Sequence, residues 1–425
     1  MIVLGLISGT SADGIDVAAA DLELRDDELV LRPLGCLEVA YPPEVQGEVD
    51  ALLPPTDAGP DAVCRVDAAL GDAFGAAADE ANAALAGGQA ALVASHGQTV
   101  FHWVEDGQAR GTLQLGQPAR IAHATGLPTI ADLRNRDIAA GGHGAPLAAY
   151  PDVLLLAGLA EDDAAAGGDE GEPASPTASS QALLNIGGIA NLTLRRADGS
   201  ALAFDSGPGN ALIDASVAEL TGGRERFDAG GRRGRRGQVH PRLLDVLLDD
   251  PYYAAPPPKS TGKEHFHQDY LADRLAVADL EAPTPSRAGD TRGSIEGDDL
   301  VATLTALTAE TIARAARAHG VGELIASGGG TRNPTLMEEL AARAPGVAVR
   351  TIDRLGIPSD GKEAYWFAVL GFLSLHNLPG ALPSCTGATH ASVLGHLSPG
   401  ANGFPRIRPV ERTPRRLRVE AAPSR

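Results

Sequence analysis

Short apolar runs that end at glycine-rich turns occur along the whole chain. Residues 2–7 form such a run, and residues 15–24 alternate partly between apolar and polar positions, as a paired strand does. We predict a third strand near residues 29–40. Residues 62–86 place Ala and Leu at helical spacing and predict a helix, and residues 91–95 predict a buried strand.

The same order of elements occurs again in the second half. Residues 182–186 predict a strand that ends at a pair of glycines. Residues 189–195 predict a second strand that runs back beside it, and residues 201–205 predict a third. After Pro208, residues 211–220 predict a helix, because proline is favourable just inside a helix start. This weak internal repeat favours a duplicated α/β fold, with two halves that face each other across a cleft.

Two segments do not fit this repeat. Residues 157–180 hold acidic residues, no basic ones, and many Ala, Gly, Ser and Pro, so we predict a disordered surface loop. Residues 404–425 are rich in Arg and poor in apolar residues, which favours a solvated tail over a docked or partner-binding one.

Length and composition limit the function classes. The 425 residues, 44% of them hydrophobic, are enough for two cores. A formal net charge of −20 argues against nucleic acid and anionic membranes as partners. The chain holds no apolar run of about 18 residues that could span a membrane, and its N-terminal stretch does not resemble a signal peptide. Three widely spaced cysteines suggest neither a disulfide framework nor a CxxC site, which fits a reduced cytoplasm.

Three glycine-rich loops are candidates for phosphate binding, because glycine lets backbone N–H groups approach an anion closely. They span residues 9–16, 185–191 and 327–333, and each follows or joins predicted strands. Tight hairpin turns are the alternative explanation for each loop. A P-loop is excluded because Gly262-Lys263 is followed by Glu264, and neither a GxGxxG after the first strand nor a GxSxG elbow is present.

The motif GTSADGID at residues 9–16 resembles the GTSxDGxD signature of the anhydro-N-acetylmuramic acid kinases. The resemblance continues along nearly the whole chain, through the blocks SHGQTVFH, LQLGQPARIAHATGLP, ADLRNRDIAAGGHGAPL, NIGGIANLT, FDSGPGNALIDA, DPYYAAPPPKSTGKEHF, SGGGTRNPTLM, GIPSDGKEAYWFA and LPSCTGA. It implies an α/β, two-domain actin-like ATPase fold, duplicated from a ribonuclease H-like unit, with ATP in the interdomain cleft. We place the first domain at residues 1–140 plus about 376–400, the second at 141–375, and an Arg-rich tail at 401–425.

The resemblance also implies one reaction. ATP, water and 1,6-anhydro-N-acetylmuramic acid, a sugar from bacterial cell-wall turnover, give N-acetylmuramic acid 6-phosphate and ADP. It further implies a homodimer. The sequence departs from the family's usual residues at His143, Ser206, Lys263 and His267, and none of these changes removes a carboxylate expected in catalysis.

Asp205 is the candidate general base for the water that attacks the anomeric carbon. It ends a predicted strand before the Gly207-Pro208-Gly209 turn, and the family's catalytic aspartate falls on this position. From the residues alone, Asp205 could equally cap the helix that follows.

The candidate ATP-binding residues come from the three glycine loops. Loop 9–16 would hold the γ-phosphate, the second loop the β-phosphate, and the third the adenosine. Many kinases of this superfamily carry an aspartate where this chain has Ile7, so Asp16 or Asp13 would contact Mg²⁺ through water. Asp13-Gly14 is also an ordinary turn pair. The residues are Gly9, Thr10, Ser11, Ala12, Asp13, Gly14, Ile15, Asp16, Gly187, Gly188, Asn191, Gly328, Gly329, Gly330 and Asn333.

The sugar carries a lactyl carboxylate, so its pocket needs a cation. Arg134 can supply a bidentate guanidinium, although a salt-bridged domain hinge is an alternative. His96 and Gln98 could meet sugar hydroxyls, or His96 could be structural. Glu363 heads a predicted helix and could contact the sugar or complement the helix dipole.

Three other functions compete with this interpretation. One is another sugar or carboxylate kinase of the same superfamily, which would need no water for ring opening. Another is a non-catalytic nucleotide-binding regulator, which would be expected to have lost Asp205 or the glycine loops. The third is a partner-binding module that acts through the Arg-rich tail.

Overall fold

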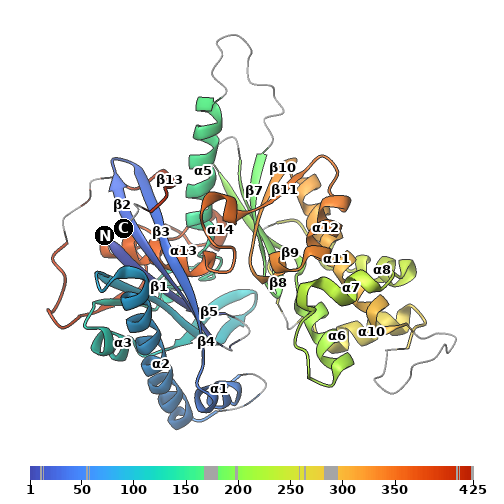
Figure 1. Cartoon of the computed structure of the whole chain (residues 1–425), viewed down its shortest axis with the longest axis horizontal. Helices are drawn as coiled ribbons and strands as arrows, with labels where there is room; N and C mark the ends of the chain where they lie inside the picture. The colour runs from blue at the N-terminus through green and yellow to red at the C-terminus, as the bar shows by residue number, and fades with distance from the viewer. Residues whose placement is uncertain are drawn as a thin grey trace. The chain divides into compact units, whose positions relative to one another are not determined.

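The computed structural model of the chain consists of two compact units, each built on its own β-sheet (Figure 1). The structure describes residues 1–9, 12, 14–53, 56, 58–166, 180–196, 200–257, 259–262, 265–281, 295–407, 410 and 412–422. The first unit comprises residues 1–168 and 355–425, and the second comprises residues 169–354.

The first unit holds an eight-stranded sheet in the order β12-β6-β4-β1-β2-β3-β13, with β5 paired to β4. Strand β1 is antiparallel to β2 and parallel to β4, and β2 is antiparallel to β3. The elements are β1 (Ile2–Ser8), β2 (Gly14–Arg25), β3 (Glu28–Ala40), α1 (Pro43–Asp50), α2 (Pro60–Ala86), β4 (Leu92–Glu105), β5 (Gln108–Leu115), α3 (Pro118–Thr125), β6 (Thr129–Ala131), α4 (Asn135–Ala139), α5 (Ala149–Ala166), α13 (Lys362–Leu375), α14 (Pro383–Thr386), β12 (His396–Ser398) and β13 (Arg416–Val419).

The second unit holds a five-stranded sheet in the order β11-β10-β7-β8-β9. Here β7 is antiparallel to β8 and parallel to β10, and β8 is antiparallel to β9. The elements are β7 (Ser180–Ile186), β8 (Ile189–Arg195), β9 (Ala201–Pro208), α6 (Ala211–Thr221), η1 (Ala229–Gly231), α7 (Arg232–Arg236), α8 (Pro241–Leu248), α9 (Pro251–Ala254), α10 (Gln268–Val277), α11 (Gly297–Ala318), β10 (Val321–Ser327), η2 (Gly329–Arg332), α12 (Pro334–Arg343), β11 (Ala348–Thr351) and η3 (Ile352–Leu355).

The two sheets share one topology, which confirms the predicted duplication. Each sheet contains three antiparallel strands that are consecutive in sequence, and two later strands that run parallel to the first strand of the three, β1 or β7. The spatial order is β3-β2-β1-β4-β6 in one unit and β9-β8-β7-β10-β11 in the other. This is the strand order of the ribonuclease H-like unit, so the predicted fold class is confirmed.

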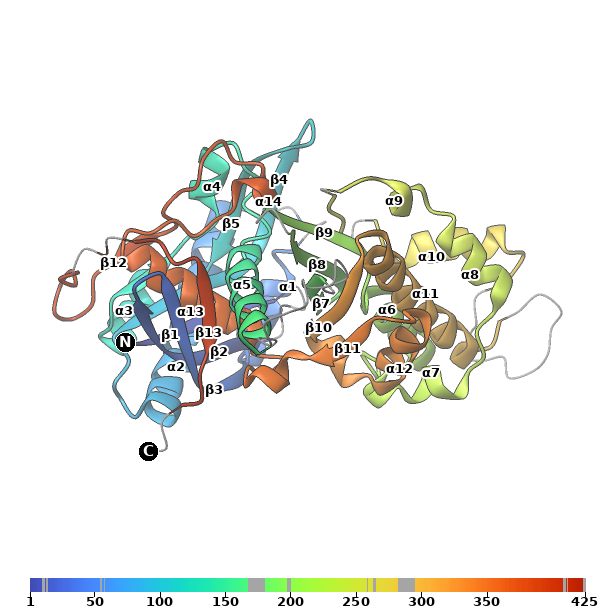
Figure 2. The same ribbon diagram turned by 90° about the horizontal axis from the view of Figure 1, so that it is seen from above.

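Strand β1 is apolar because both of its faces are covered. Leu4 and Leu6 pack into a core beneath α2, whereas Gly5 faces α13 on the other side (Figure 2). A Cβ atom at Gly5 would overlap the backbone carbonyl of Ala364. Glycine at this position therefore allows α13 to lie directly on the central strand.

The limits of the two units differ from the predicted domain limits. We assigned residues 141–168 and 355–375 to the second domain, but they belong to the first unit. The reason is packing, because α13 lies on β1, β2 and β4, and α5 packs against β13. Both helices cover the first sheet although the chain passes through the second unit between them.

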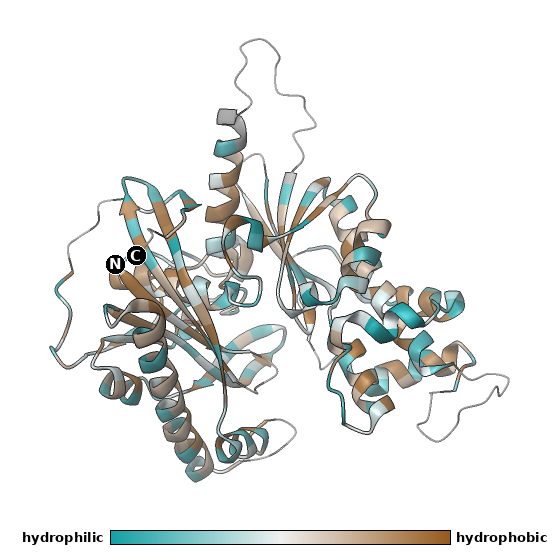
Figure 3. Cartoon of the chain, in the orientation of Figure 1, coloured by the Kyte–Doolittle hydropathy of each residue, from teal (hydrophilic) through white to brown (hydrophobic). Residues whose placement is uncertain are grey.

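The prediction of a disordered loop at residues 157–180 is wrong over its first part, because α5 extends to Ala166. Ala157 is buried, and Gly158 allows a close approach of the Leu417 backbone. In Figure 3 the first turns of α5 are hydrophobic and polar residues lie nearer its end. Residues 167–179 lie outside the described residues.

The expectation of a solvated Arg-rich tail is also wrong in part. Strand β13 pairs in parallel with β3, and Leu417 is fully buried. Arg416 forms ion pairs with Glu28 and Glu161, and Arg418 pairs with Glu28 and Asp162. The acidic end of α5 and the basic strand β13 therefore bind each other through ion pairs. Neither segment was predicted to be structured, because each one's partner is distant in sequence.

A buried ion pair fixes the start of α13 to α5. The Lys362 ammonium lies 2.9 Å from Asp152 Oδ1, and these side chains are 2% and 3% exposed. Trp366 Nε1 donates to the same oxygen at 2.6 Å. Removal of one buried partner leaves the other charge desolvated and typically costs about 3–5 kcal/mol.

We expect Lys362→Met to lower the free energy of unfolding of the first unit by about 3–5 kcal/mol, and Lys362→Met/Asp152→Asn to restore more than half of that loss. Both tryptophans, Trp103 and Trp366, belong to this unit, so urea titration followed by tryptophan fluorescence reports on it alone. A double variant as unstable as the single one would contradict a coupled pair.

Candidate active site

Four polar residues form one row across the second sheet. Ser327 of β10 is the register partner of Asn185 in β7, Asn185 pairs with Asn191 in β8, and Asn191 pairs with Asp205 in β9. Directly paired residues project from the same face of a sheet. The row therefore ends in the Asp205 carboxylate and runs alongside two of the predicted glycine loops. Ser327 and Asn185 lie in two of the predicted loops, but the sequence assigned no role to their side chains.

A β-bulge sets the position of Asp205. Between β8 and β9 the register jumps, because Ala190 pairs with Gly207 while Asn191 pairs with Asp205, which leaves Ser206 as the extra residue. Ser206 Oγ donates to the Ala190 carbonyl at 3.1 Å and holds the bulge. Such bulges commonly redirect a side chain beside an active site.

Two donors hold the Asp205 carboxylate. Ser260 Oγ donates to Asp205 Oδ2 at 3.0 Å, and the Thr261 backbone N–H donates to the same oxygen at 2.9 Å. The Asp205 backbone is held as well, because its N–H donates to the Lys259 carbonyl and its carbonyl accepts from the Tyr252 hydroxyl. These bonds fix the orientation of the carboxylate.

Asp205 is not a helix cap. Helix α6 begins at Ala211, its N-cap residue is Asn210, and Asp205 lies inside β9. The N-cap interpretation of Asp205 is therefore wrong, because the bulged strand continues through the glycine turn to Pro208.

The segment around Lys259 sets the electrostatics beside Asp205. Burial and the Asp205 charge both raise the pKa of Tyr252 well above its usual range. Burial lowers the pKa of Lys259, and the Asp205 charge opposes that shift. Lys259 Nζ donates to the Tyr252 and Tyr253 carbonyls and lies 4.5 Å from the centre of the Tyr252 ring. Tyr252 therefore stays protonated, and the ammonium neutralises part of the nearby negative charge.

The two glycine loops of this unit are tightly constrained. The Gly187 and Gly188 carbonyls accept bonds from the N–H groups of Asn210, Gly209 and Ala211. Gly328 has φ +86°, and a Cβ there would lie 2.7 Å from Asn185 Oδ1, whereas a Cβ at Gly329 would meet nothing within 4 Å. Asn333 caps α12, because its Oδ1 accepts from the Leu336 N–H at 3.0 Å.

The first glycine loop joins β1 to β2. Thr10, Ser11 and Asp13 lie outside the described residues. Ala12 bonds back to the Gly9 carbonyl, Ile15 is a core residue with 1% exposure, and Asp16 stands opposite Ile7 in the sheet.

Gln98 anchors the start of this loop. Ser8 Oγ donates to Gln98 Oε1 at 2.6 Å, and Gln98 Nε2 donates to the Thr99 carbonyl at 3.0 Å. Gln98 is 2% exposed. Its amide therefore supports the loop, and the Ser8 contribution to that support was not predicted.

His96 and Arg134, two of the predicted sugar-binding residues, contact each other. Arg134 Nε donates to His96 Nε2 at 2.8 Å, and Arg134 Nη1 donates to the Gly144 carbonyl at 2.7 Å. The opposite ring nitrogen of His96, Nδ1, lies 2.9 Å from the Gly97 carbonyl. His96 is thus neutral, with its proton on Nδ1 and Nε2 as the acceptor.

Glu363 is the fourth predicted sugar residue, and its charge interacts with Arg134. Burial raises the pKa of the Glu363 carboxyl, while the Lys362 and Arg134 charges oppose the shift. Burial lowers the pKa of Arg134, and Glu363 opposes that shift. The Arg134 guanidinium thus donates to His96 and Gly144 and also interacts electrostatically with Glu363.

Acid should destabilise the first unit through His96. Burial and the Arg134 charge hold the pKa of His96 well below its usual 6.5. Stability from the neutral imidazole is fully present above pH 6.5 and is lost as pH falls from there toward the folded-state pKa, by up to about 1.4 kcal/mol per pH unit. We expect urea titrations from pH 7 to pH 5 to show this slope, and His96→Asn to reduce it. Equal slopes in the two proteins would contradict a neutral His96.

The chain is similar to known proteins along nearly its whole length. The profile of the anhydro-N-acetylmuramic acid kinase family matches residues 1–400. Proteins with that name include one from Streptomyces coelicolor, 51% identical over 100% of both chains, and one from Rhodococcus erythropolis, 49% identical over 99% of this chain and 100% of the relative. A third, from Caldanaerobacter subterraneus, is 37% identical over 93% of this chain and 96% of the relative. A solved ROK family glucokinase from Streptomyces griseus has a TM-score of only 0.33 and 13% identity, over 87% of this chain and 98% of that chain.

Proposed function

The chain belongs to the anhydro-N-acetylmuramic acid kinase family, and from that premise we propose the reaction it catalyses. Water adds to the anomeric carbon of 1,6-anhydro-N-acetylmuramic acid, the C1–O6 bond breaks, and O6 takes the γ-phosphoryl group of ATP. The products are N-acetylmuramic acid 6-phosphate and ADP, in the turnover of cell-wall sugars. The observation that supports this proposal most is the Asp205 carboxylate, held by Ser260 and Thr261 on a bulged strand.

Asp205 acts as the general base. It removes a proton from the attacking water while the bond from C1 to O6 breaks. The departing oxygen O6 is itself the phosphoryl acceptor, so a concerted step needs no separate acid. The two bonds to Oδ2 keep the carboxylate in one orientation, which is what positioning of a water requires.

The glycine turns bind ATP. Open space beside Gly9 and Gly329 lets a ligand approach the backbone, and Gly328 takes a conformation that L side chains rarely adopt. Asn333 holds the helix that follows the third loop and acts as a positioning residue.

Mg²⁺ would be held through Asp16 or Asp13 together with ATP phosphates. No cluster of three His, Cys, Asp or Glu side chains suited to a metal occurs among the described residues. Mg²⁺ in kinases typically takes only one or two carboxylates and completes its shell with phosphate and water, so one aspartate at this position fits this mode. The bound ion supplies charge neutralisation to the phosphates.

The anhydro sugar binds through Arg134, His96 and Glu363. Arg134 pairs with the lactyl carboxylate through the edge that contains Nη2, because its Nε–H and one Nη1–H already donate to His96 and Gly144. Glu363 accepts a hydrogen bond from a sugar hydroxyl. Gln98 acts indirectly, since both ends of its amide serve the protein.

The protein works as a homodimer in the cytoplasm. None of the three cysteines, all of which the structure describes, forms a disulfide, which suits a reducing compartment. In the described part of the chain no helix has the length and hydropathy needed to cross a membrane.

The activity is tested by substrate choice. With ATP and Mg²⁺, we expect turnover of 1,6-anhydro-N-acetylmuramic acid to a product heavier by one water and one phosphoryl group, measured by mass spectrometry. N-acetylmuramic acid and N-acetylglucosamine, which have no anhydro bridge, should be phosphorylated far more slowly. Preference for either of these sugars would favour an ordinary sugar kinase instead.

A further inference from the structure

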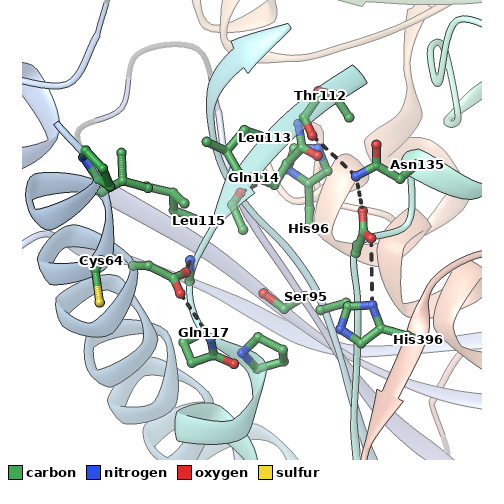
Figure 4. A pocket seen from close by; sticks show the side chains of 18 of the residues that line it. Cys64, Ser95, His96, Thr112, Leu113, Gln114, Leu115, Gln117, Asn135 and His396 are labelled. Atoms are coloured by element: carbon green, nitrogen blue, oxygen red, sulfur yellow. Dashed lines mark hydrogen bonds and ion pairs between the residues drawn. The ribbon is translucent and has the colours of Figure 1, made fainter. Parts of the chain in front are cut away.

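A separate pocket lies within the first unit. It has a volume of about 790 Å³ and is lined by residues from the first turns of α2, from β4 and β5, and from the ends of α3, β6 and β12 (Figure 4). Cavities that bind small organic ligands in proteins typically measure about 300–1,000 Å³. The volume alone therefore suits a molecule of one or two sugar rings.

Two buried polar atoms in this pocket lack partners. Ser95 is 1% exposed, and its Oγ makes no hydrogen bond within the described structure. Gln114 Oε1 is likewise buried without a partner, while Gln114 Nε2 donates to Thr99 and Thr112 and so fixes the direction of the amide. Figure 4 shows the Ser95 side chain directed into the pocket. Buried polar atoms without partners are rare, because leaving them unsatisfied costs free energy.

The pocket borders on His96, but the Ser95 side chain lies on the opposite face of β4 from the His96 ring that accepts from Arg134. Side chains alternate along a strand, and Val93 belongs to the core beneath α2, so Ser95 faces the α2 side. Ala94 contacts α13, and the His96 ring packs on Phe367 of α13. The Arg134 guanidinium and the Ser95 hydroxyl therefore serve different spaces.

The charge of the lining argues against an anionic occupant. Asp67 and Asp132 line the pocket, and no Lys or Arg occurs among the described residues that line it. Both carboxylates are already hydrogen-bonded: Asp67 accepts from the Gly116 N–H and Gln117 Nε2, and Asp132 accepts from Asn135 Nδ2. ATP and any muramic acid derivative are anions, so this lining would repel them.

The remaining lining is mixed. It includes the apolar side chains of Val63, Leu115 and Pro118 beside polar ones such as Thr112 and Asn135. A sugar ring has apolar C–H faces and hydroxyl or amide groups that both donate and accept. It can donate to Gln114 Oε1, bond to Ser95 Oγ and pack against these side chains. We propose that this pocket binds an uncharged saccharide of one or two rings, on the side of β4 away from the Arg134 guanidinium. This proposal does not depend on the proposed reaction.

Cys64 provides a direct reporter of occupancy. It lines the pocket and is exposed, whereas Cys36 is partly buried and Cys385 is buried. We expect saturating N-acetylglucosamine to slow the alkylation of Cys64 severalfold, measured by peptide mass spectrometry, with Cys36 as the internal reference. N-acetylmuramic acid, which adds a carboxylate to the same ring, should protect Cys64 much less at equal concentration.

Two serine variants separate binding from folding. Ser95→Ala should weaken the affinity for N-acetylglucosamine by about five- to tenfold, as the loss of one hydrogen bond does, while thermal stability stays equal or rises. Ser216→Ala is the matched control, because Ser216 in α6 is also buried and its Oγ also lacks a partner, but Ser216 does not line the pocket. Ser216→Ala should leave the affinity for N-acetylglucosamine unchanged.

Three results would overturn the proposal. The first is no protection of Cys64 by N-acetylglucosamine up to its solubility limit, which would mean a pocket filled only by water. The others are equal protection of Cys64 by N-acetylmuramic acid and an unchanged affinity for N-acetylglucosamine in Ser95→Ala. None of these results bears on turnover of the anhydro sugar.

Discussion

Asp205→Asn should lower kcat by about 10³-fold or more while the KM for ATP changes little. The amide keeps the shape of the side chain and can still accept from Ser260 and Thr261, but it cannot take a proton from water. General-base catalysis typically contributes about 10²–10⁴-fold. Steady-state kinetics of ADP release, with both substrates varied, measures the effect.

Two control variants test whether the loss is chemical. Asp245→Asn makes the same change at an exposed position on α8 of the same unit and should leave kcat unaltered. Ser260→Ala removes one of the two bonds to Oδ2 and should lower kcat about tenfold, without the full loss. Substantial turnover in Asp205→Asn would remove Asp205 from the role of base.

Arg134→Gln should lower kcat/KM for the anhydro sugar by about 10²–10³-fold. Removing one member of a desolvated charge pair typically costs about 2–5 kcal/mol, and here the carboxylate of the ligand would lose its cation. Comparison of 1,6-anhydro-N-acetylmuramic acid with 1,6-anhydro-N-acetylglucosamine, which lacks the lactyl group, isolates this contact. The wild type should discriminate strongly between them, and the variant should not.

Arg136→Gln is the matched control, since Arg136 lies two residues away and is exposed. It should keep wild-type kinetics with both sugars. If Arg134→Gln lost activity toward both sugars equally, Arg134 would be a structural residue that holds His96 and Gly144, as the hinge alternative supposes.

Much of the fold was predictable because its strands are contiguous apolar runs with glycine turns. The expected repeat of strands and helix appears in both sheets in the same strand order. Helix α5 and strand β13 were missed because their partners are distant in sequence. Glu161 and Arg416 are 255 residues apart. The local sequence pattern at each position therefore shows only an acidic stretch or a basic stretch.

The candidate site was predictable where residues sit at strand ends and less so where distant segments meet. Asp205 could be named from its place before a glycine turn, whereas Ser260 and Thr261, which hold its carboxylate, lie 55 and 56 residues further along. The block DPYYAAPPPKSTGKEHF was part of the family resemblance, but no pattern within it assigned a role to its serine and threonine. For Gln98, the sequence indicated a polar side chain after a buried strand, and only the Ser8 contact shows that it supports the first glycine loop.

The most direct test of the account is the isotope content of the product formed in ¹⁸O-water with ATP and 1,6-anhydro-N-acetylmuramic acid. Attack by water at C1, with O6 as phosphoryl acceptor, predicts one ¹⁸O at C1 and none in the bond between C6 and the phosphate. Quenching soon after mixing and borohydride reduction keep the C1 label from exchanging. A product without ¹⁸O at C1, or with ¹⁸O between C6 and phosphorus, would contradict the coupled hydrolysis and phosphorylation.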